Sequence, residues 1–410
     1  MALWSSGLVL KTSSMGDHSG ILVTIEGWGV NLAGCYGNAL LPTPSIDRLA
    51  AHGIVFDQFW MHSTYLEPNL QAILQKIHPS RWLVASDSIQ ATSMLRHIAD
   101  LDRLDVTHDP DRESFDHLLT EALESWLQQR QQTPFLWIHS KGLAGPWDAP
   151  YAYRQLMCDA DDPDPPKDTD PPELVLSKDF DPDLLFGLAC GAGAQSVVID
   201  QGIGLILQTL KEIGIEENCW IALAGILGFP LGEHRRVGLG HRSLDPTSIE
   251  PSRADAYSER LHTPWMIRPA PEMKLGTRLN RLLQPRDLGD WIELLSDGRD
   301  SKNLVETYKH ATLAWAAGDG EIALLTEHWS ARFDTSKDSN AVVSILEDRI
   351  GEIYCFPEDR WQQNEIGNRV PEVQILMRQI ASILLLDHHK PNPQSDRLSE
   401  LLSDLSTIRR

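Results

Sequence analysis

Three short runs of apolar residues recur along the chain, and each is separated from the next by helical sequence. They cover residues 21–25, 134–139 and 220–223. Apolar runs of this length without polar alternation are typical of strands buried on both faces. Between two of them, residues 114–131 form an amphipathic helix whose apolar stripe holds Phe115, Leu118, Leu119, Ala122, Leu123 and Trp126. This alternation predicts an α/β fold with a mostly parallel central sheet sandwiched by helices.

The predicted organisation is one large domain followed by a small one. A chain of 410 residues, of which 42% are hydrophobic, can bury a sizeable core. We predict the α/β domain over residues 15–300 and a C-terminal α+β subdomain over residues 306–390, where short polar and apolar stretches begin.

Residues 159–183, which we call the acidic segment, differ in composition from the rest of the chain. They hold ten acidic residues, two lysines and six prolines. Proline blocks helix and ladder bonding and like charges repel, so we expect a solvated surface loop, or else a docking tail for a basic partner. A flexible glycine-containing return at residues 187–193 and a helix over residues 196–213 should follow.

Charge and cysteine content limit the partners and the location. A net charge of −22 argues against nucleic acid and anionic membranes, because phosphates would be repelled. Residues 1–14 make a poor signal peptide, and no apolar run approaches the roughly 20 residues of a membrane helix. Five scattered cysteines without a C-x-x-C pair fit reduced thiols. We expect a cytoplasmic protein that binds an unknown protein or a small anionic ligand.

Several motifs occur in a defined order along the chain. Residues 21–29 (ILVTIEGWG) are followed by residues 34–38 (GCYGN) and 43–50 (TPSIDRLA). Later come residues 145–148 (GPWD), 232–234 (GEH) and 261–268 (LHTPWMIR). The ordered set resembles the sulfatase family of the alkaline phosphatase/sulfatase superfamily. That resemblance implies the family's α/β sandwich, its small final domain and hydrolysis of sulfuric esters.

The resemblance also locates the family's metal site, and there the ligands are replaced. A sulfatase holds a calcium-like ion, which needs several oxygen ligands. The first ligand pair maps to Glu26 and Gly27, and only Glu26 could still ligate. The second pair maps to Ile226 and Leu227, which carry no donor atom. We therefore expect no cofactor, or one divalent ion such as calcium if the protein is active.

The family's nucleophile motif, C/S-x-P-x-R, maps to residues 66–70 (LEPNL). The nucleophile position is Leu66 and the arginine position is Leu70, and leucine supplies neither a lone pair nor a charge. A shift in register would make Thr64 a weak alternative nucleophile. The plainer interpretation is that Thr64 lines the approach to the next helix.

Other polar residues could take over part of this site. Lys141, His234 and Arg235 are candidates for binding an anion. A replacement metal cluster would draw on residues of proper ligand type, namely Glu233, His234, His241, Asp245 and His262. Ordinary surface or hydrogen-bonded histidines are the plainer interpretation.

Three functions fit these observations. The first is a sulfatase-like protein that has lost catalysis and acts as a binding or scaffold protein. The second is an active sulfate- or phosphate-ester hydrolase with a rebuilt metal site. The third is a structural subunit that partners an active paralogue. The first agrees best with losses at several independent site positions.

Overall fold

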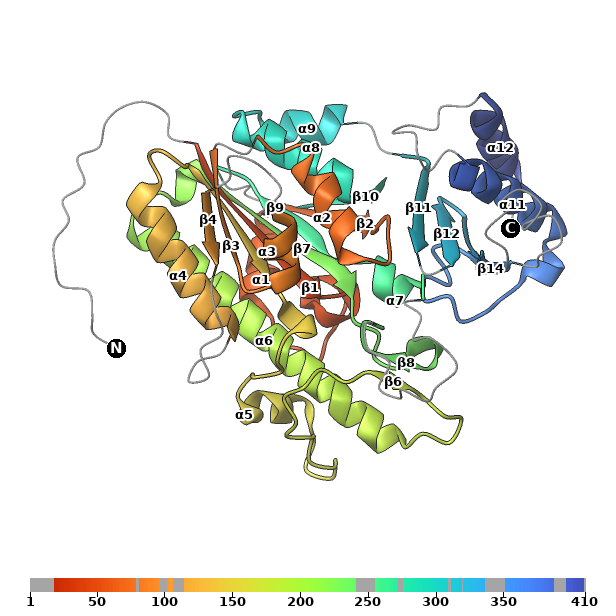
Figure 1. The fold of residues 1–410 in the computed structure, drawn as a ribbon, viewed down its shortest axis with the longest axis horizontal. Helices are drawn as coiled ribbons and strands as arrows, with labels where there is room; N and C mark the ends of the chain where they lie inside the picture. Colours follow the sequence, from red (N-terminus) through yellow and green to blue (C-terminus); the bar gives the residue numbers. More distant parts are fainter. Residues whose placement is uncertain are drawn as a thin grey trace.

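A computed structural model describes residues 18–78, 81–95, 102–105, 114–240, 255–271, 276–308, 311–318, 320–335, 351–386 and 396–408. Figure 1 shows a large α/β unit and, at one end of the long axis, a smaller unit made from the last part of the chain. The predictions for residues 1–14, His241 and Asp245 lie outside the described residues.

The large unit is built on one eight-stranded sheet in the order β10-β2-β9-β7-β1-β5-β3-β4. Strand β9 is antiparallel to both of its neighbours, and the other pairs are parallel. The strands are β1 (Ser19–Gly27), β2 (Ile54–Phe59), β3 (Trp82–Ser86), β4 (Asp102–Asp105), β5 (Phe135–Ser140), β7 (Cys219–Gly228), β9 (Trp265–Arg268) and β10 (Thr277–Leu283). The mostly parallel sheet predicted from the sequence is confirmed.

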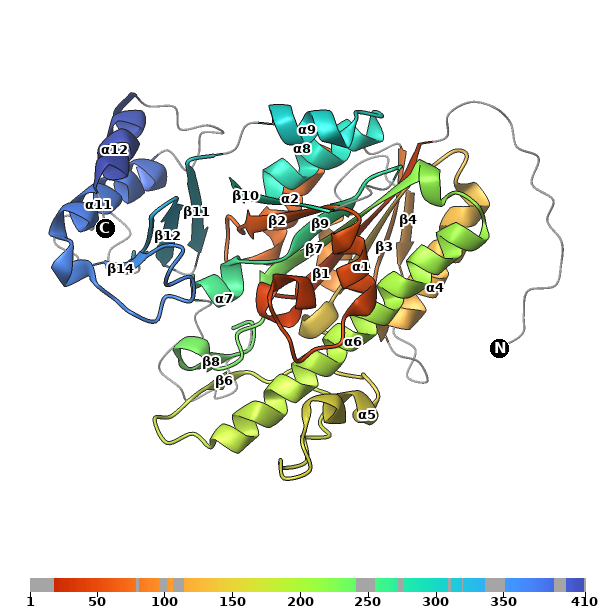
Figure 2. The same cartoon turned by 180° about the vertical axis from the view of Figure 1, so that it is seen from behind.

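Helices cover both faces of this sheet, as Figures 1 and 2 show from opposite sides. One face carries α1 (Pro44–Ala51), α4 (Ser114–Gln129) and α6 (Pro182–Glu212). The other carries α2 (Leu66–Leu74), α3 (Ile89–Leu95), α8 (Pro285–Ser296) and α9 (Ser301–Thr307). The alternation of side chains along β1 explains the two cores, because Ile21, Val23 and Ile25 enter the first and Leu22 the second.

Shorter elements lie around the carboxyl edge of the sheet. They are the turns η4 (Gly142–Ala144), η5 (Gln155–Met157) and η7 (Glu233–Arg235), the helices α5 (Tyr151–Arg154) and α7 (Ser258–Leu261), and the strand pair β6 (Leu174–Val175) and β8 (Arg236–Val237). The acidic segment is fixed to this region, because the Arg154 guanidinium donates to the carbonyls of Pro166 and Asp168.

The prediction for the start of helix α6 was wrong. The helix begins at Pro182, with Asp181 as its N-cap, rather than near residue 196. The glycines at 187–193 are therefore helical, not a flexible return. Gly191 and Gly193 serve packing, because a Cβ at either position would meet Trp147 or Met157 at less than 3 Å.

Helix α6 is also long and apolar enough to cross a membrane, with 61% of its most apolar window buried in the protein. A core helix of a soluble protein passes the same test, so this is weak evidence for a membrane span.

The smaller unit is an antiparallel sheet in the order β11-β12-β13-β14, packed against two helices. Its strands are β11 (Leu313–Gly318), β12 (Glu321–Thr326), β13 (Trp329–Asp334) and β14 (Glu352–Cys355). Its helices are α11 (Pro371–Leu386) and α12 (Asp396–Thr407), which lie side by side. Helix α12, which the sequence analysis did not predict, adds Leu398, Leu401 and Leu405 to the core of this unit.

Candidate functional site

The four residues assigned to the metal site converge at the carboxyl edge of the sheet. Strands β1 and β7 are neighbours, and Glu26 lies opposite Ile226. The register shifts after Glu26, so that Gly27 lies opposite Gly228. Leu227 has a φ of 59°, in the left-handed region that leucine rarely adopts. The backbone thus brings the positions together, while three of the four side chains offer no ligand atom.

The space beside Gly27 is filled by its neighbours. Gly27 has a φ of +76°, and a Cβ built there would lie 2.8 Å from the Cβ of Leu143 in turn η4. Leu143 is itself fully buried. Both the backbone conformation and the packing therefore disfavour any side chain at position 27, including the aspartate of the family pattern.

Helix α7 closes the site from the side of β7. A Cβ on Gly228 would lie 2.0 Å from the carbonyl oxygen of Glu259. The same oxygen lies 3.6 Å from the Cβ position of Gly29, just beyond β1. The backbone of α7 thus rests directly on the backbone at Gly228, which only glycine at that position permits, whereas its distance from Gly29 is an ordinary van der Waals contact.

The side chains at the nucleophile and arginine positions of α2 are buried. Leu66 and Leu70 are 3% and 1% exposed and belong to the core beneath α2. The alternative nucleophile Thr64 is fully buried, and a Cβ on Gly318 would meet its hydroxyl oxygen at 2.0 Å. A nucleophile must reach its substrate, so this geometry does not suit Thr64 to that role.

The one remaining carboxylate, Glu26, is held by a buried chain of hydrogen bonds. The His139 Nε2 lies 2.9 Å from Glu26 Oε1, and Nδ1 lies 2.8 Å from the hydroxyl of Thr24. The indole of Trp137 donates to the same hydroxyl at 2.8 Å. A neutral imidazole with its proton on Nε2 satisfies all three contacts. The arrangement has the residue types of a catalytic triad, but Thr24 and His139 are fully buried and unreachable.

Lys141 and a second carboxyl group, that of Asp87, lie beside this series of hydrogen bonds. The backbone N–H of Lys141 donates to Asp87 Oδ1 at 2.8 Å, directly after strand β3. Burial raises the pKa of Asp87 to about 6, although Lys141 and His139 act in the opposite direction. Lys141 is half-buried. Its backbone thus contacts Asp87, and the charges of Lys141, His139 and Glu26 all act on that carboxyl group.

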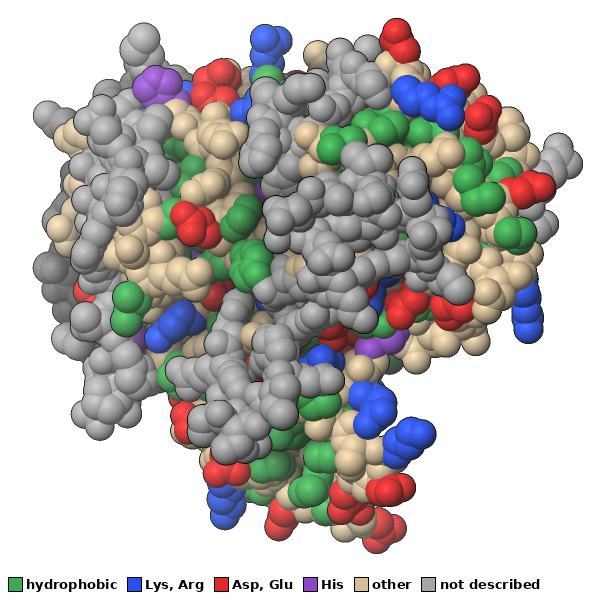
Figure 3. Space-filling view, turned by 45° about the vertical axis from the view of Figure 1, so that its right-hand side comes forward, with side chains coloured by type: hydrophobic (Ala, Val, Ile, Leu, Met, Phe, Trp, Pro, Cys, Tyr) green, Lys and Arg blue, Asp and Glu red, His purple; other side chains and the backbone are tan. Residues whose placement is uncertain are grey.

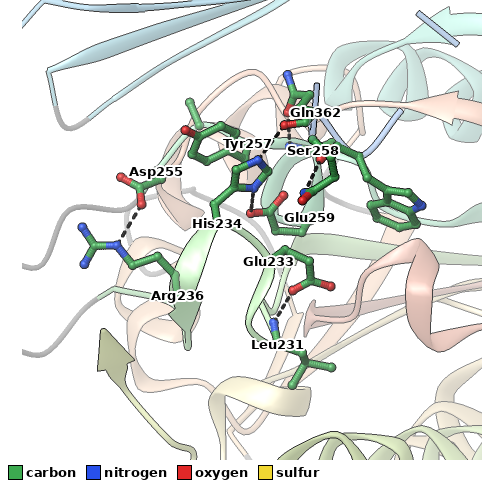
Figure 4. Close-up of polar contacts among 12 residues, drawn as sticks. Leu231, Glu233, His234, Arg236, Asp255, Tyr257, Ser258, Glu259 and Gln362 are labelled. Atoms are coloured by element: carbon green, nitrogen blue, oxygen red, sulfur yellow. Dashed lines mark hydrogen bonds and ion pairs between the residues drawn. The ribbon is translucent and has the colours of Figure 1, made fainter. Parts of the chain in front are cut away.

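His234 and Arg235 are engaged in bonds within the protein. Arg235 donates through its guanidinium to the carbonyl of Leu176 in the acidic segment. His234 Nδ1 lies 2.8 Å from Glu259 Oε1, and its Nε2 donates to the carbonyl of Gln362 in the C-terminal subdomain, also at 2.8 Å (Figure 4). Both residues have positive φ, which places the imidazole in this bridging position.

The electrostatics of His234 follow from these two contacts. Burial lowers its pKa, but the hydrogen bond and charge of Glu259, together with the Gln362 carbonyl, outweigh burial and raise it. The imidazolium donates from both nitrogens, and so compensates the Glu259 carboxylate, which is only 2% exposed.

Aromatic stacking extends this bridge into the C-terminal subdomain. The Tyr257 ring stacks on His234 with centroids 3.6 Å apart, and the Arg332 guanidinium lies 3.5 Å from the Tyr257 centroid. Arg332 pairs with Glu321 at 3.2 Å. We call His234, Tyr257, Glu259, Arg332 and Gln362 the clasp, because they join the α/β domain to the subdomain.

The described residues do not fit a calcium ion. Hard divalent ions take several oxygen ligands, whereas Glu26 is the only carboxylate among the four mapped positions and already accepts from His139. Nor do any three His, Cys, Asp or Glu side chains among the described residues lie together as metal ligands.

His262, a member of the alternative metal cluster considered in the sequence, is buried, stacks on Trp60 and donates to the Asp57 carbonyl. Burial lowers its pKa to about 4.

Three residues of this region were missed by sequence reasoning. His139 ends a predicted strand, and the β1–β5 pairing would have placed it opposite Thr24, two positions before Glu26, had the strand order been known. Asp87 follows strand β3, which gave no clear signal in the sequence. Glu259 lies in a four-residue helix, and nothing in its local sequence indicates the contact with His234.

The fold of this chain is similar to those of several solved structures. The chain matches a protein solved with its substrate D-glucosamine-2-N,6-O-disulfate at 14% identity and a TM-score of 0.64, covering 92% of this chain and 99% of that one. It matches the phosphonate monoester hydrolase of Agrobacterium radiobacter at 11% identity and a TM-score of 0.66, covering 90% and 96%. It matches a 2-O GAG sulfatase at 12% identity and a TM-score of 0.60, covering 95% and 94%.

These likenesses define the class of fold. The chain has the α/β fold of these sulfatase and phosphonate monoester hydrolase structures, with an antiparallel C-terminal subdomain, and the resemblance read from its motifs is confirmed at the level of the fold. No protein-family model and no curated protein sequence matches the chain. Identities of 11–14% agree with the divergence at the mapped site positions.

Proposed function

We propose that this chain is a non-catalytic binding or scaffold protein on a sulfatase-like fold. The observation that carries the proposal is the occupied space at the carboxyl edge of the sheet. Leu143 lies where a side chain on Gly27 would begin, and the carbonyl of Glu259 lies where one on Gly228 would begin. Ile226 and Leu66, at two further family positions, are buried in the apolar core.

The apolar character of these positions supports the same proposal. Buried carboxylates without an ion or partner are unfavourable, so a site without its metal is most stable when filled by apolar groups. Gly27, Ile226, Leu227, Leu66 and Leu70 fit that expectation together, whereas a rebuilt hydrolase needs a reachable nucleophile or a metal-bound water.

The partner we propose is an unidentified protein or a small anionic ligand. Of the three sequence-predicted cations, His234 and Arg235 donate to groups of the protein itself, so Lys141 is the best remaining candidate to meet an anion. The expectations of a cytoplasmic location and of no nucleic-acid or membrane partner stay predictions.

The test is turnover of three chromogenic esters, 4-nitrophenyl sulfate, 4-nitrophenyl phosphate and a 4-nitrophenyl phosphonate monoester. Purified protein is assayed without added metal and with calcium, magnesium, manganese or zinc. Glu26→Gln and Thr64→Val are assayed alongside, because a contaminating hydrolase would be unaffected by either change. We expect no turnover above the blank for any of the three proteins. Wild-type turnover that is lost in Glu26→Gln or Thr64→Val would establish a rebuilt hydrolase instead.

A further inference from the structure

Two of the five cysteines lie together at the base of the acidic segment. Cys158 Sγ and Cys190 Sγ are 3.8 Å apart, although 32 positions separate them in the chain. Cys158 ends the turn η5, just before the acidic segment, and Cys190 lies inside helix α6, just after it. The pair therefore brackets the whole segment, which Figure 1 places at the lower edge of the molecule with α5 and the first half of α6.

Both thiols are held in place by well-packed backbone. The Cys158 thiol donates to the carbonyl of Arg154. Arg154 is 3% exposed, and its guanidinium donates to the carbonyl of Trp147 at 2.7 Å. On α6, the absence of a side chain at Gly191 lets the Trp147 ring approach closely next to Cys190. The contact between the two sulfurs thus follows from the packing of α5 and η5 on α6.

We infer that Cys158 and Cys190 form a reversible oxidation site that takes a small-molecule disulfide and closes a covalent ring around the acidic segment. To form the bond, the two sulfurs approach from 3.8 Å to about 2.05 Å. The inference is independent of the function proposed above.

The two cysteines have different roles in this reaction. Cys158 is half-buried and Cys190 is 1% exposed, so the small-molecule disulfide reaches Cys158 first. The Cys158 thiolate attacks one sulfur of the disulfide, forms a mixed disulfide and releases one thiol. Cys190 then loses its proton and attacks the Cys158 sulfur, releasing the second thiol. Two protein thiols are oxidised, and one small-molecule disulfide is reduced to two thiols.

Burial accounts for the order of these steps. It raises the pKa of the Cys190 thiol to about 12, with a further contribution from Cys158, so Cys190 is a poor first nucleophile. Cys35 is half-buried as well, and burial raises its pKa to about 12. Cys35 therefore makes a matched control for a thiol of similar exposure at a different place in the fold.

The ring would fix the acidic segment at both ends. The C-terminal end of the acidic segment is already fixed, because the Asp181 carboxylate caps α6. Its middle contacts the loop beside the clasp through the Leu176 carbonyl and Arg235, and through Glu173 and the N–H groups of Leu239 and Gly240. The lower lobe in Figure 3 carries acidic and apolar side chains on its surface. Val175 is an exposed apolar residue of the acidic segment, and the exposed Leu156 and Leu184 flank it in the sequence. Oxidation would hold this surface in one arrangement.

Peptide mapping of the full chain tests the inference. The folded protein is incubated with glutathione disulfide, free thiols are alkylated, and lysyl endopeptidase cleaves the chain. Cleavage at Lys141, Lys167, Lys178 and Lys211 puts Cys158 in the peptide 142–167 and Cys190 in the peptide 179–211, each as its only cysteine. We expect these two peptides to be linked, and the link to disappear after dithiothreitol.

The controls make each outcome decisive. Cys158→Ser and Cys190→Ser should each abolish the link, and Cys35→Ser should leave its yield unchanged. Two results would overturn the inference. One is a glutathione adduct that persists on Cys158 without the link. The other is a pair of free thiols in the folded wild type under conditions where urea-unfolded protein reacts fully. Both are read from the wild type, so a variant that fails to fold does not prevent the decision.

Discussion

Two regions at the same edge of the sheet have opposite chemistry. At the ends of β1 and β7, where the fold family holds its metal, contacts are made by glycines, leucines and a backbone carbonyl. Next to this region, η7, α7 and the C-terminal subdomain meet in the clasp, which is rich in charged and aromatic groups. Helix α7 belongs to both regions, because the Glu259 carbonyl rests on Gly228 while its carboxylate meets His234.

The difference shows two ways in which one edge of the sheet is packed. Where ligand side chains are gone, close packing of backbone and apolar groups fills the space at no electrostatic penalty. Where charges remain, His234 pairs with Glu259 and Arg332 pairs with Glu321. The two pairs are joined across the domain boundary by the His234–Gln362 hydrogen bond and by the Arg332 guanidinium over the Tyr257 ring. Loss of a charge should therefore destabilise the clasp. Added side-chain volume should destabilise the filled edge formed by Gly27, Leu143, Gly228 and the Glu259 carbonyl, which we call the closed site.

The largest effect should come from the clasp. His234→Ala leaves the buried Glu259 carboxylate without its donor, and we expect a loss of about 3–5 kcal/mol in the free energy of unfolding. His117→Ala is the control, because His117 is buried to a similar degree but lies 4.0 Å from Glu121, whose side chain is 48% exposed and stays solvated without its partner, so that we expect about 0–1 kcal/mol. Urea unfolding of the three proteins measures both. Equal losses in the two variants would mean that the clasp contributes no more to the free energy of unfolding than the His117–Glu121 pair does.

The clasp should also weaken as the pH rises. The folded state raises the pKa of His234 above its ordinary 6.5, so its stabilising contribution is complete below pH 6.5 and is lost as the pH passes through the folded value. Unfolding free energies of wild type and His234→Gln should therefore differ most below pH 6.5 and converge above neutrality. A difference that grows with pH would contradict this direction.

The second effect tests the closed site by adding one methyl group. Gly27→Ala combines a positive φ of +76° with a clash against Leu143, and we expect it to destabilise the protein by about 2–4 kcal/mol. Gly214→Ala is the matched control, because Gly214 has a φ of +71° and nothing within 4 Å of the added Cβ. That variant should lose only about 1 kcal/mol from backbone strain. Equal losses would show that the space beside Gly27 is open.

The third effect, smaller than both of these, concerns Asp87. Its pKa is about 6 in the folded protein against 3.8 as the ordinary value, so the folded state binds the proton more tightly. Stability should fall from pH 4 to pH 6 through this group, by on the order of 1–3 kcal/mol, and stay level above. Asp87→Asn keeps an oxygen for the Lys141 N–H and should remove that part of the fall. Parallel pH profiles of the two proteins would refute the assignment.

The smallest effect should come from Thr64. Its hydroxyl is fully buried and has no hydrogen-bond partner in the described structure, so Thr64→Val replaces an unsatisfied polar atom by a methyl of similar size. We expect the stability to stay within about 1 kcal/mol of wild type or to rise slightly. Thermal unfolding measures this change. A clear loss of stability would indicate a partner for the hydroxyl, and with it a role for Thr64 in the site.

The parts of the fold that could be predicted from the sequence are those with local signals. Strand β1 and helix α4 follow from their apolar patterns, and the convergence of Glu26 with Ile226 follows from the family resemblance. The start of α6 was misplaced because glycine disfavours helix locally, whereas the packing of Trp147 on Gly191 is a contact across more than 40 positions.

The closure of the site was beyond prediction for the same reason. The loss of ligands at Gly27 and Ile226 is visible in the sequence, but the groups that fill the space are not. Leu143 and the Glu259 carbonyl come from segments more than 30 positions away from the glycines that they contact. Their arrival depends on how turn η4 and helix α7 pack on the finished sheet, which no periodicity in the sequence encodes.

The most direct test of the closed site is the metal content of the chain. Protein purified without chelators is analysed by elemental mass spectrometry for calcium, magnesium, manganese and zinc, with the Gly27→Ala variant as a second sample. Our account predicts far less than one metal ion per chain in both. One ion per chain in the wild type would contradict it, because the edge formed by Glu26, Gly27 and Ile226 would then be a rebuilt metal site.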